Sequence, residues 1–143
     1  MEELLVEEIR IGPLKLRYFV DGSRTNGAVD CFEFAVPAQT TGTHPHYHEG
    51  VDELVFGVEG RVTFTVDGQD RVIGPRDFCF IPRGVVHCFS NKHDTAAVAL
   101  SVLTPALIGP AYFREMAAVA KAVTRPDPLI VKSIMERHGL MPV

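Results

Sequence analysis

The sequence predicts an all-β domain, a sandwich or barrel, followed by a short helical tail. Short runs rich in Val, Ile, Phe, Tyr and Thr recur through the first hundred residues and are separated by turn residues. After residue 104 the apolar residues change to steps of three and four, which is the period of a helix. We therefore expect a β-sandwich or barrel with N-terminal strands over residues 1–104, and a helical tail over residues 105–143 that packs on this β-domain or on a partner subunit.

Composition limits the class of protein. A chain of 143 residues with 46% hydrophobic and 22% charged residues can bury a core, which excludes a disordered chain. Its 14 basic and 18 acidic residues argue against a nucleic-acid partner. The candidate membrane segment, residues 96–113, is interrupted by Pro105 and Pro110. Three cysteines without a close pair make no disulfide framework, and the chain begins without a basic signal region, so we expect a cytoplasmic protein with no membrane partner.

Eight runs are predicted as strands: Leu14–Val20, Asp30–Val36, Glu53–Val58, Arg61–Val66, Arg71–Ile73, Phe78–Ile81, Val86–Ser90 and Ala96–Leu103. The dipeptides Asp21-Gly22, Asn26-Gly27 and Asp67-Gly68 lie between such runs and favour the positive φ of tight hairpin turns. The third is the clearest, because apolar residues and threonines alternate just before it.

Two helices are predicted in the tail. The first carries an apolar stripe and has Pro110 in its first turn; the stripe consists of Tyr112, Phe113, Met116, Val119, Ala120 and Val123. The second begins with Asp127 as N-cap and Pro128 at the first helical position. We expect it to end at Gly139 in a left-handed conformation, with Leu140 closing back on its last turn.

Three histidines and one glutamate form a candidate metal site. His46 and His48 lie two residues apart, so on a strand both imidazoles point to one face. Glu53 follows five residues later, and His87 stands at the head of a later strand. This mixed nitrogen and oxygen set suits one divalent transition metal per chain, with Fe, Mn, Ni, Co, Cu and Zn all compatible.

The same residues carry a resemblance to the cupin family. His46-x-His48-x4-Glu53-x6-Gly60 resembles the first cupin motif, and Pro82-x-Gly84-x2-His87-x3-Asn91 resembles the second. The family's opening glycines would fall at Thr40 and Arg76, so the sequence departs from the pattern at two turn positions. The resemblance implies a double-stranded β-helix, the cupin jelly-roll barrel, with a short C-terminal helical extension similar to that of small quercetin-dioxygenase-like cupins.

The resemblance also implies a function. His46, His48, Glu53 and His87 would be the metal ligands, and Glu53 could also act as the catalytic base toward an acidic hydroxyl of the substrate. The expected activity is that of a metal-dependent, quercetinase-like non-haem dioxygenase acting on a small molecule. Two alternatives stay open: an oxygen-independent isomerase, decarboxylase or lyase that uses the metal as a Lewis acid, and a non-catalytic barrel that binds a small ligand.

Four further residues are candidates for a substrate pocket, although for the three aromatic ones a place in the core is favoured over the pocket: His44, Phe78, Phe80 and Phe89. His44 could also pair with His46, but only His46 and His48 have the number of residues before Glu53 that is usual in the cupin motif, so they are favoured as the pair. His93 and His138 fit structural or solvated roles. Small cupins often dimerise, so we expect a homodimer, with the runs Leu4–Ile11 and Leu14–Val20 as candidates for the contact.

Overall fold

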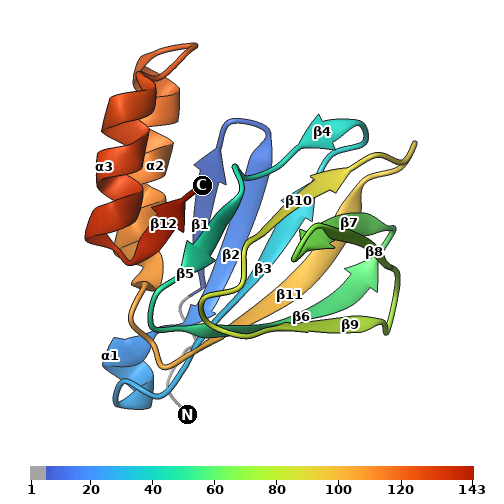
Figure 1. The fold of residues 1–143 in the computed structure, drawn as a ribbon, viewed down its shortest axis with the longest axis horizontal. Coiled ribbons are helices and arrows are strands. Elements are labelled where there is room, and N and C mark those ends of the chain that lie inside the picture. Colours follow the sequence, from blue (N-terminus) through green and yellow to red (C-terminus); the bar gives the residue numbers. More distant parts are fainter. Residues whose placement is uncertain (1–5) are drawn as a thin grey trace.

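The computed structural model describes residues 6–143. In it the chain folds into two antiparallel sheets that face each other (Figure 1). The first sheet has the order β1-β2-β3-β11-β6-β9, with bounds β1 Glu7–Ile11, β2 Leu14–Val20, β3 Asp30–Val36, β11 Ala97–Thr104, β6 Asp52–Glu59 and β9 Phe78–Ile81. The second has the order β12-β5-β10-β7-β8, with bounds β12 Leu140–Pro142, β5 His46–His48, β10 His87–Asn91, β7 Val62–Val66 and β8 Gln69–Ile73. The short strand β4, Thr40–Thr41, pairs with β10.

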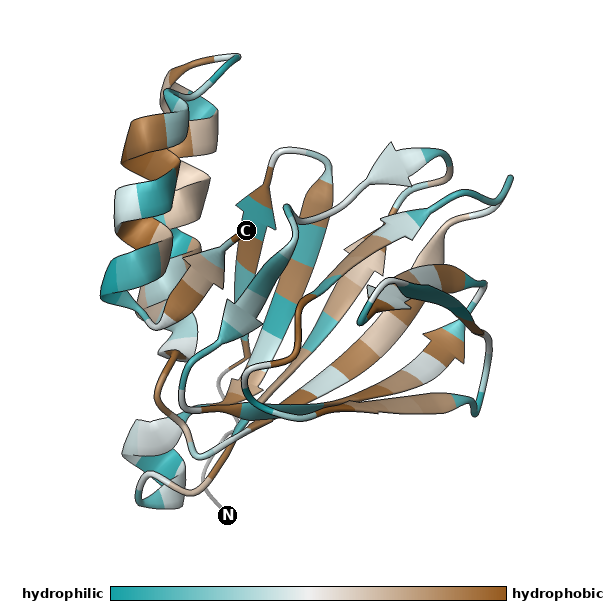
Figure 2. Ribbon diagram, in the orientation of Figure 1, coloured by the Kyte–Doolittle hydropathy of each residue, from teal (hydrophilic) through white to brown (hydrophobic). Residues whose placement is uncertain are grey.

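The core lies between the sheets because apolar residues alternate along the strands, as the bands of Figure 2 show. In β11, for example, Ala97, Ala99, Ser101 and Leu103 are buried while the residues that alternate with them, Val98, Leu100 and Val102, are half-buried. A strand coincides with each of the eight predicted runs, and the jelly-roll barrel expected from the resemblance is confirmed. Of the expected N-terminal run, Leu4 and Leu5 lie outside the described residues.

The three predicted turn dipeptides have different outcomes. Asp67 and Gly68 take φ of 50° and 77° and connect β7 to β8, so the predicted hairpin is correct. The other two dipeptides flank α1, Gly22–Thr25, a single helical turn. Asp21 caps this helix by accepting from the Ser23 N–H, and Asn26 ends it in the left-handed conformation. Residues suited to turns also suit helix caps, which is why the hairpin expectation was wrong there.

The tail forms two helices, α2 at Gly109–Ala122 and α3 at Pro128–Arg137, which lie side by side next to β12 and β1 (Figure 1). The ring of Phe113 in α2 packs with its centroid 5.0 Å from that of Phe32, so the start of the apolar stripe packs against this chain's own sheet, while Val123 at its end is 49% exposed. Asp127 caps α3 through the Leu129 N–H, and Gly139 has φ of 81°, as predicted. No helix within residues 6–143 is long and apolar enough to cross a membrane.

Arg76 stands at one of the two positions where the cupin pattern has a glycine, and its backbone takes the conformation of a glycine. Its φ is 71°, the left-handed conformation that a glycine adopts without strain, and its N–H donates to the carbonyl of Gly57. A left-handed non-glycine residue costs about 1–2 kcal/mol. The loop therefore keeps the backbone path that a glycine favours even though arginine occupies the position.

Gly60 gives a test of this fold. Its φ is 61°, and a Cβ added there would overlap the carbonyl oxygen of Ala96. Gly68 has φ of 77° with open space around it, so it serves as a matched control. Both substitutions by alanine carry the left-handed strain, but only Gly60→Ala also forces the backbone apart, so it should lower the free energy of unfolding by about 2 kcal/mol more. Urea denaturation measures this difference, and equal losses for the two variants would contradict the packing.

Candidate metal centre

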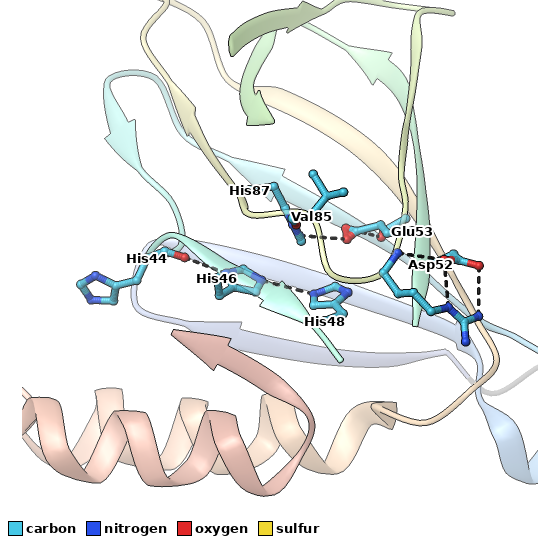
Figure 3. Close-up of polar contacts among 9 residues, drawn as sticks. His44, His46, His48, Asp52, Glu53, Val85 and His87 are labelled. Atoms are coloured by element: carbon cyan, nitrogen blue, oxygen red, sulfur yellow. Dashed lines mark hydrogen bonds and ion pairs between the residues drawn. The ribbon is translucent and has the colours of Figure 1, made fainter. Parts of the chain in front are cut away.

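Strands β5 and β10 bring the three histidines together between the sheets (Figure 3). His46 is the cross-strand partner of His87, and His48 lies on the same face two residues along β5. The ring centroids are 4.6 Å apart for His46 and His87, 4.8 Å for His48 and His87, and 5.2 Å for His46 and His48. Each histidine offers a ring nitrogen within 4.8 Å of the other two, which is the arrangement a single ion requires.

Backbone carbonyls orient two of these imidazoles. The Nδ1–H of His46 donates to the carbonyl of His44 at 2.6 Å, and the Nδ1–H of His87 donates to that of Val85 at 3.0 Å. A proton on Nδ1 leaves the lone pair of Nε2 free and directed into the cluster. The Nε2 atoms of His46 and His48 are 3.3 Å apart, which is close enough for both to bind one cation between them.

Burial keeps the three imidazoles neutral. Between 4% and 5% of the surface of each histidine is exposed. Desolvation lowers the pKa of all three, and the neighbouring imidazoles lower the pKa of His46 and His48 further, that of His48 to about 3. Because a metal binds the neutral imidazole, the cluster holds its ligands in the binding form at neutral pH.

Glu53 lies beside this cluster and outside the mutual 4.8 Å group. Its Oε2 is 3.8 Å from Nε2 of His87, and its Oε1 accepts a hydrogen bond from Ser101 at 3.1 Å. Desolvation raises the pKa of Glu53 to about 7, against the lowering effect of His46 and of the Ser101 hydroxyl. The carboxyl can therefore change its protonation state near neutral pH next to the histidines.

Two positioning contacts were not predicted from the sequence. Ser101 is fully buried on β11 and holds one oxygen of Glu53. Its signal in the sequence is a polar residue at an inward position of an otherwise apolar strand. Asp52 accepts from the backbone N–H, Nε and Nη2 of Arg83 at 2.9, 3.2 and 3.1 Å, and so ties the loop before His87 to β6 (Figure 3).

The four predicted pocket residues lie in different parts of the structure. Phe89 points inward, and its ring packs 5.1 Å from that of Phe34 and 5.5 Å from that of Phe64. Phe78 and Phe80 are 71% and 52% exposed, so their prediction as core or pocket residues was wrong. Both alternate with the buried Cys79 on β9, which places them on the outer face of the sheet.

His44 contributes its backbone carbonyl to the site while its imidazole is exposed and points away from the cluster (Figure 3). The other two histidines lie elsewhere: His93 follows Asn91 in a turn, and His138 bonds Glu115 at 2.9 Å. A surface hollow of about 430 Å³ lies along β1, β2 and α1, and one of about 620 Å³ lies between β1 and α2; neither is lined by a residue of the histidine cluster.

The other residues of the two resembling motifs have structural contacts. Asn91 is 1% exposed, and its amide donates to the carbonyls of Val36 and Thr95 at 3.1 and 2.8 Å. These bonds join β10, β3 and the turn before β11. The N–H of Gly84 donates to the carbonyl of His48 at 2.9 Å, which joins the two histidine-bearing segments.

The family model for the cupin domain matches residues 32–103, half of the chain. This chain belongs to the cupin family. The matched segment contains the three histidines and Glu53, and runs from β3 to the end of β11.

Individual proteins also resemble parts of the chain. It is 38% identical over 72 residues to quercetin 2,3-dioxygenase of Bacillus subtilis, covering 50% of this chain and 20% of that protein. An uncharacterized protein of Aquifex aeolicus is 29% identical over 65 residues, covering 46% and 53%. The chain thus matches a fifth and about half of the length of these relatives. A solved structure described as a predicted oxalate decarboxylase of Thermotoga maritima superposes with a TM-score of 0.62 at 24% identity, covering 72% of this chain and 94% of that one, and shows the shared fold.

Proposed function

We propose that this cupin holds one divalent transition metal through His46, His48 and His87, and that it is a non-haem dioxygenase acting on a small molecule. The observation that carries the proposal is the buried cluster of three neutral imidazoles with donor nitrogens within 4.8 Å of one another. The partial identity to a quercetin dioxygenase supports the reaction class. The donor set accommodates Fe, Mn, Ni, Co, Cu or Zn.

The residues fit the metal by their chemistry. Two Nδ1–H groups are engaged by carbonyls, so lone pairs on Nε2 face the cluster. A bound metal supplies Lewis acidity toward a substrate oxygen and, where redox-active, electron transfer to dioxygen. A dioxygenase places both atoms of O2 in the organic product, so the reaction balances without an added reductant.

In this proposal Glu53 is the base that accepts the proton of the substrate hydroxyl. Its buried carboxyl lies 3.8 Å from His87, and burial raises its pKa to about 7, so at neutral pH it can accept a proton from an acidic hydroxyl of the substrate. The Ser101 hydroxyl, at 3.1 Å, keeps one carboxylate oxygen occupied, which leaves the other to face the cluster. Glu53 can also become a fourth ligand, as the family resemblance implies, if its side chain turns toward the ion.

The test is anaerobic loading with Fe(II), Mn(II), Co(II) or Ni(II), followed by oxygen uptake with flavonols, enediols and β-diketones as substrates. The variant His46→Ala/His48→Ala is the control. We expect uptake above this control with at least one metal, and none above it with every metal would refute the dioxygenase proposal.

A second candidate follows from the position of Glu53. A protonatable carboxyl beside a Lewis-acid metal also suits isomerisation, decarboxylation or lyase chemistry, in which a proton moves next to a polarised carbonyl. Turnover with zinc under strict anaerobiosis would favour this candidate. Tight binding of a small ligand without turnover, with any metal, would instead favour a binding barrel.

We also propose that the chain forms a homodimer, through a face different from the one expected from the sequence. Helix α2 packs on β1, and the outer face of β1 and β2 carries the ion pairs Glu8–Arg10 and Glu8–Lys15. Exposed apolar side chains gather instead on the outer face of two other strands, here called the β6–β9 face: Leu54, Phe56, Val58, Phe78 and Phe80. Patches of this kind on soluble proteins mark interaction surfaces.

The charges at the ends of these two strands favour a second copy as the occupant. Three basic and three acidic side chains flank the β6–β9 face: Arg61, Arg76, Arg83, Asp52, Glu59 and Asp77. Because both signs are present, opposite charges can meet across the two-fold axis of an isologous dimer, although Asp52 and Arg83 also pair with each other within the chain.

Substitution of Phe80 tests the dimer. Phe80→Asp should convert a dimer of the 15.7 kDa chain into a monomer, because it places a charge in the apolar face. Val72 on β8 is 51% exposed against 52% for Phe80, so Val72→Asp is the matched control and should remain dimeric. Sedimentation equilibrium measures the mass. A monomeric parent chain, or a Phe80→Asp dimer as tight as the parent, would contradict the proposed face.

A further inference from the structure

Strand β5 carries two of the three clustered histidines and is only three residues long. Toward β10 it has a single cross-strand pair, His46 with His87, and one further bond from the Gly84 N–H to the His48 carbonyl. Toward β12 it is paired along its whole length. Most of the backbone pairing of β5 therefore comes from the last residues of the chain, which lie about ninety positions later in the sequence.

The hydrogen bonds at the two ends of the β5–β12 pairing show which residues of the two strands are joined through the backbone. The Glu49 N–H donates to the Gly139 carbonyl at 2.9 Å, and the Val143 N–H donates to the Pro45 carbonyl at 3.0 Å. Bonded and non-bonded pairs alternate in an antiparallel ladder, so Met141 and Tyr47 form the bonded pair between them. Tyr47 is thus held by β12 through its backbone, while the histidines on either side of it turn their side chains into the cluster.

The neighbouring non-bonded pairs bring β12 side chains next to the histidines. Leu140 lies opposite His48, and Pro142 lies opposite His46. Residues directly opposite in such pairs place their side chains close together on the same face. Leu140 and His48 are each 5% exposed, so Leu140 helps to exclude water from the His48 imidazole. Pro142 occupies a position where its missing N–H removes no bond to β5.

The helical tail determines where β12 lies. Gly139, with φ of 81°, turns the chain out of α3 directly into β12. Arg137 and His138, at the end of α3, bond the carboxylate of Glu115 on α2 at 3.2 and 2.9 Å. Since α2 packs on β1, the position of β12 is connected through the two helices to the first sheet.

From these contacts we propose that β12 is a positioning element of the histidine cluster: its pairing with β5 holds His46 and His48 in register with His87, so that loss of the pairing weakens metal binding while the barrel stays folded. This inference rests on the metal centre proposed above. It assigns a role in that centre to a segment that supplies no ligand and lies outside the residues matched by the family model.

Met141 provides a test with a matched control. Met141→Pro removes the N–H that bonds Tyr47, whereas Met141→Ala shortens the side chain and keeps the backbone bond. We expect Met141→Pro to lower the affinity for Co(II) at least tenfold, measured by titration, and Met141→Ala to stay within twofold of the parent. Loss of a group that orients ligands typically costs 10–100-fold in metal affinity.

Hydrogen exchange without metal gives a second readout. In Met141→Pro, and in a chain shortened after Gly139, the Tyr47 amide should exchange at least tenfold faster, while amides of β11 and β6 keep their protection. If the parent chain binds no Co(II), the proposed metal function fails, and this exchange measurement still tests the role of β12. Equal Co(II) affinity or equal Tyr47 exchange in parent and Met141→Pro would overturn the inference, as would unfolding of the whole barrel in both the Met141→Pro and the shortened chain.

Discussion

Replacing His48 by alanine is expected to weaken the binding of Co(II) or Zn(II) at least 100-fold. His48 is one of the three donors within 4.8 Å of one another, and removing it leaves two ligands, which hold an ion poorly. The same loss is expected for His87→Ala. Equilibrium dialysis or competition with a chromogenic chelator measures the affinity at a fixed pH, since protons compete for the same nitrogens.

Two controls make this result specific. His44→Ala removes an exposed imidazole next to the cluster but keeps the carbonyl that bonds His46, so it should change the affinity less than threefold. Glu53→Gln should cost about tenfold or less, because Glu53 stands outside the mutual group and is already bonded to Ser101. A loss for Glu53→Gln as large as for His48→Ala would show that Glu53 is a full ligand, and a large loss for His44→Ala would contradict the three-histidine centre.

The metal-free protein is expected to lose stability as the pH falls below 6.5. Burial and the neighbouring imidazoles lower the pKa of His48 from 6.5 to about 3, so between these values only the unfolded chain binds the proton. Protonation then stabilises the unfolded state, and at pH 4.5 the cost from His48 alone is about 3 kcal/mol. His46 and His87, whose pKa values are also lowered by burial, act in the same direction.

Glu53 has the opposite effect on stability. Burial raises its pKa from 4.5 to about 7, so between these values the folded chain holds a proton that the unfolded chain releases. This contribution stabilises the fold below pH 4.5 and is lost as the pH rises through 7. Between pH 7.5 and pH 4.5 this contribution amounts to about 3 kcal/mol, which offsets the loss of stability caused by one of the three histidines.

Two variants separate these effects in urea denaturation of the chelator-treated protein between pH 7.5 and 4.5. His48→Asn cannot take up the proton, so its stability should fall less steeply with acid than that of the parent. Glu53→Gln lacks the compensating carboxyl, so its stability should fall more steeply. Curves that run parallel to the parent for both variants would show that neither group titrates differently in the folded and unfolded chains.

Local pattern was sufficient for most of the secondary structure. The alternation along β3, β7 and β11 and the caps of α3 are properties of neighbouring residues, so they can be read from one segment at a time. A hairpin was predicted where the one-turn helix α1 forms. This shows the limit of that approach, since Asp and Asn favour both turns and helix caps.

Residue pattern alone was enough to predict the all-β fold with its helical tail, and to single out His46, His48, Glu53 and His87 as a candidate site. Their role as metal ligands stays a prediction. The packed structure was needed to show that Phe78 and Phe80 face outward, that Ser101 holds Glu53 beside the histidines, and that β12 pairs with β5. The reason is physical: period and capping depend on residues close in the chain, whereas the register between strands fifty or ninety residues apart depends on how the whole core packs.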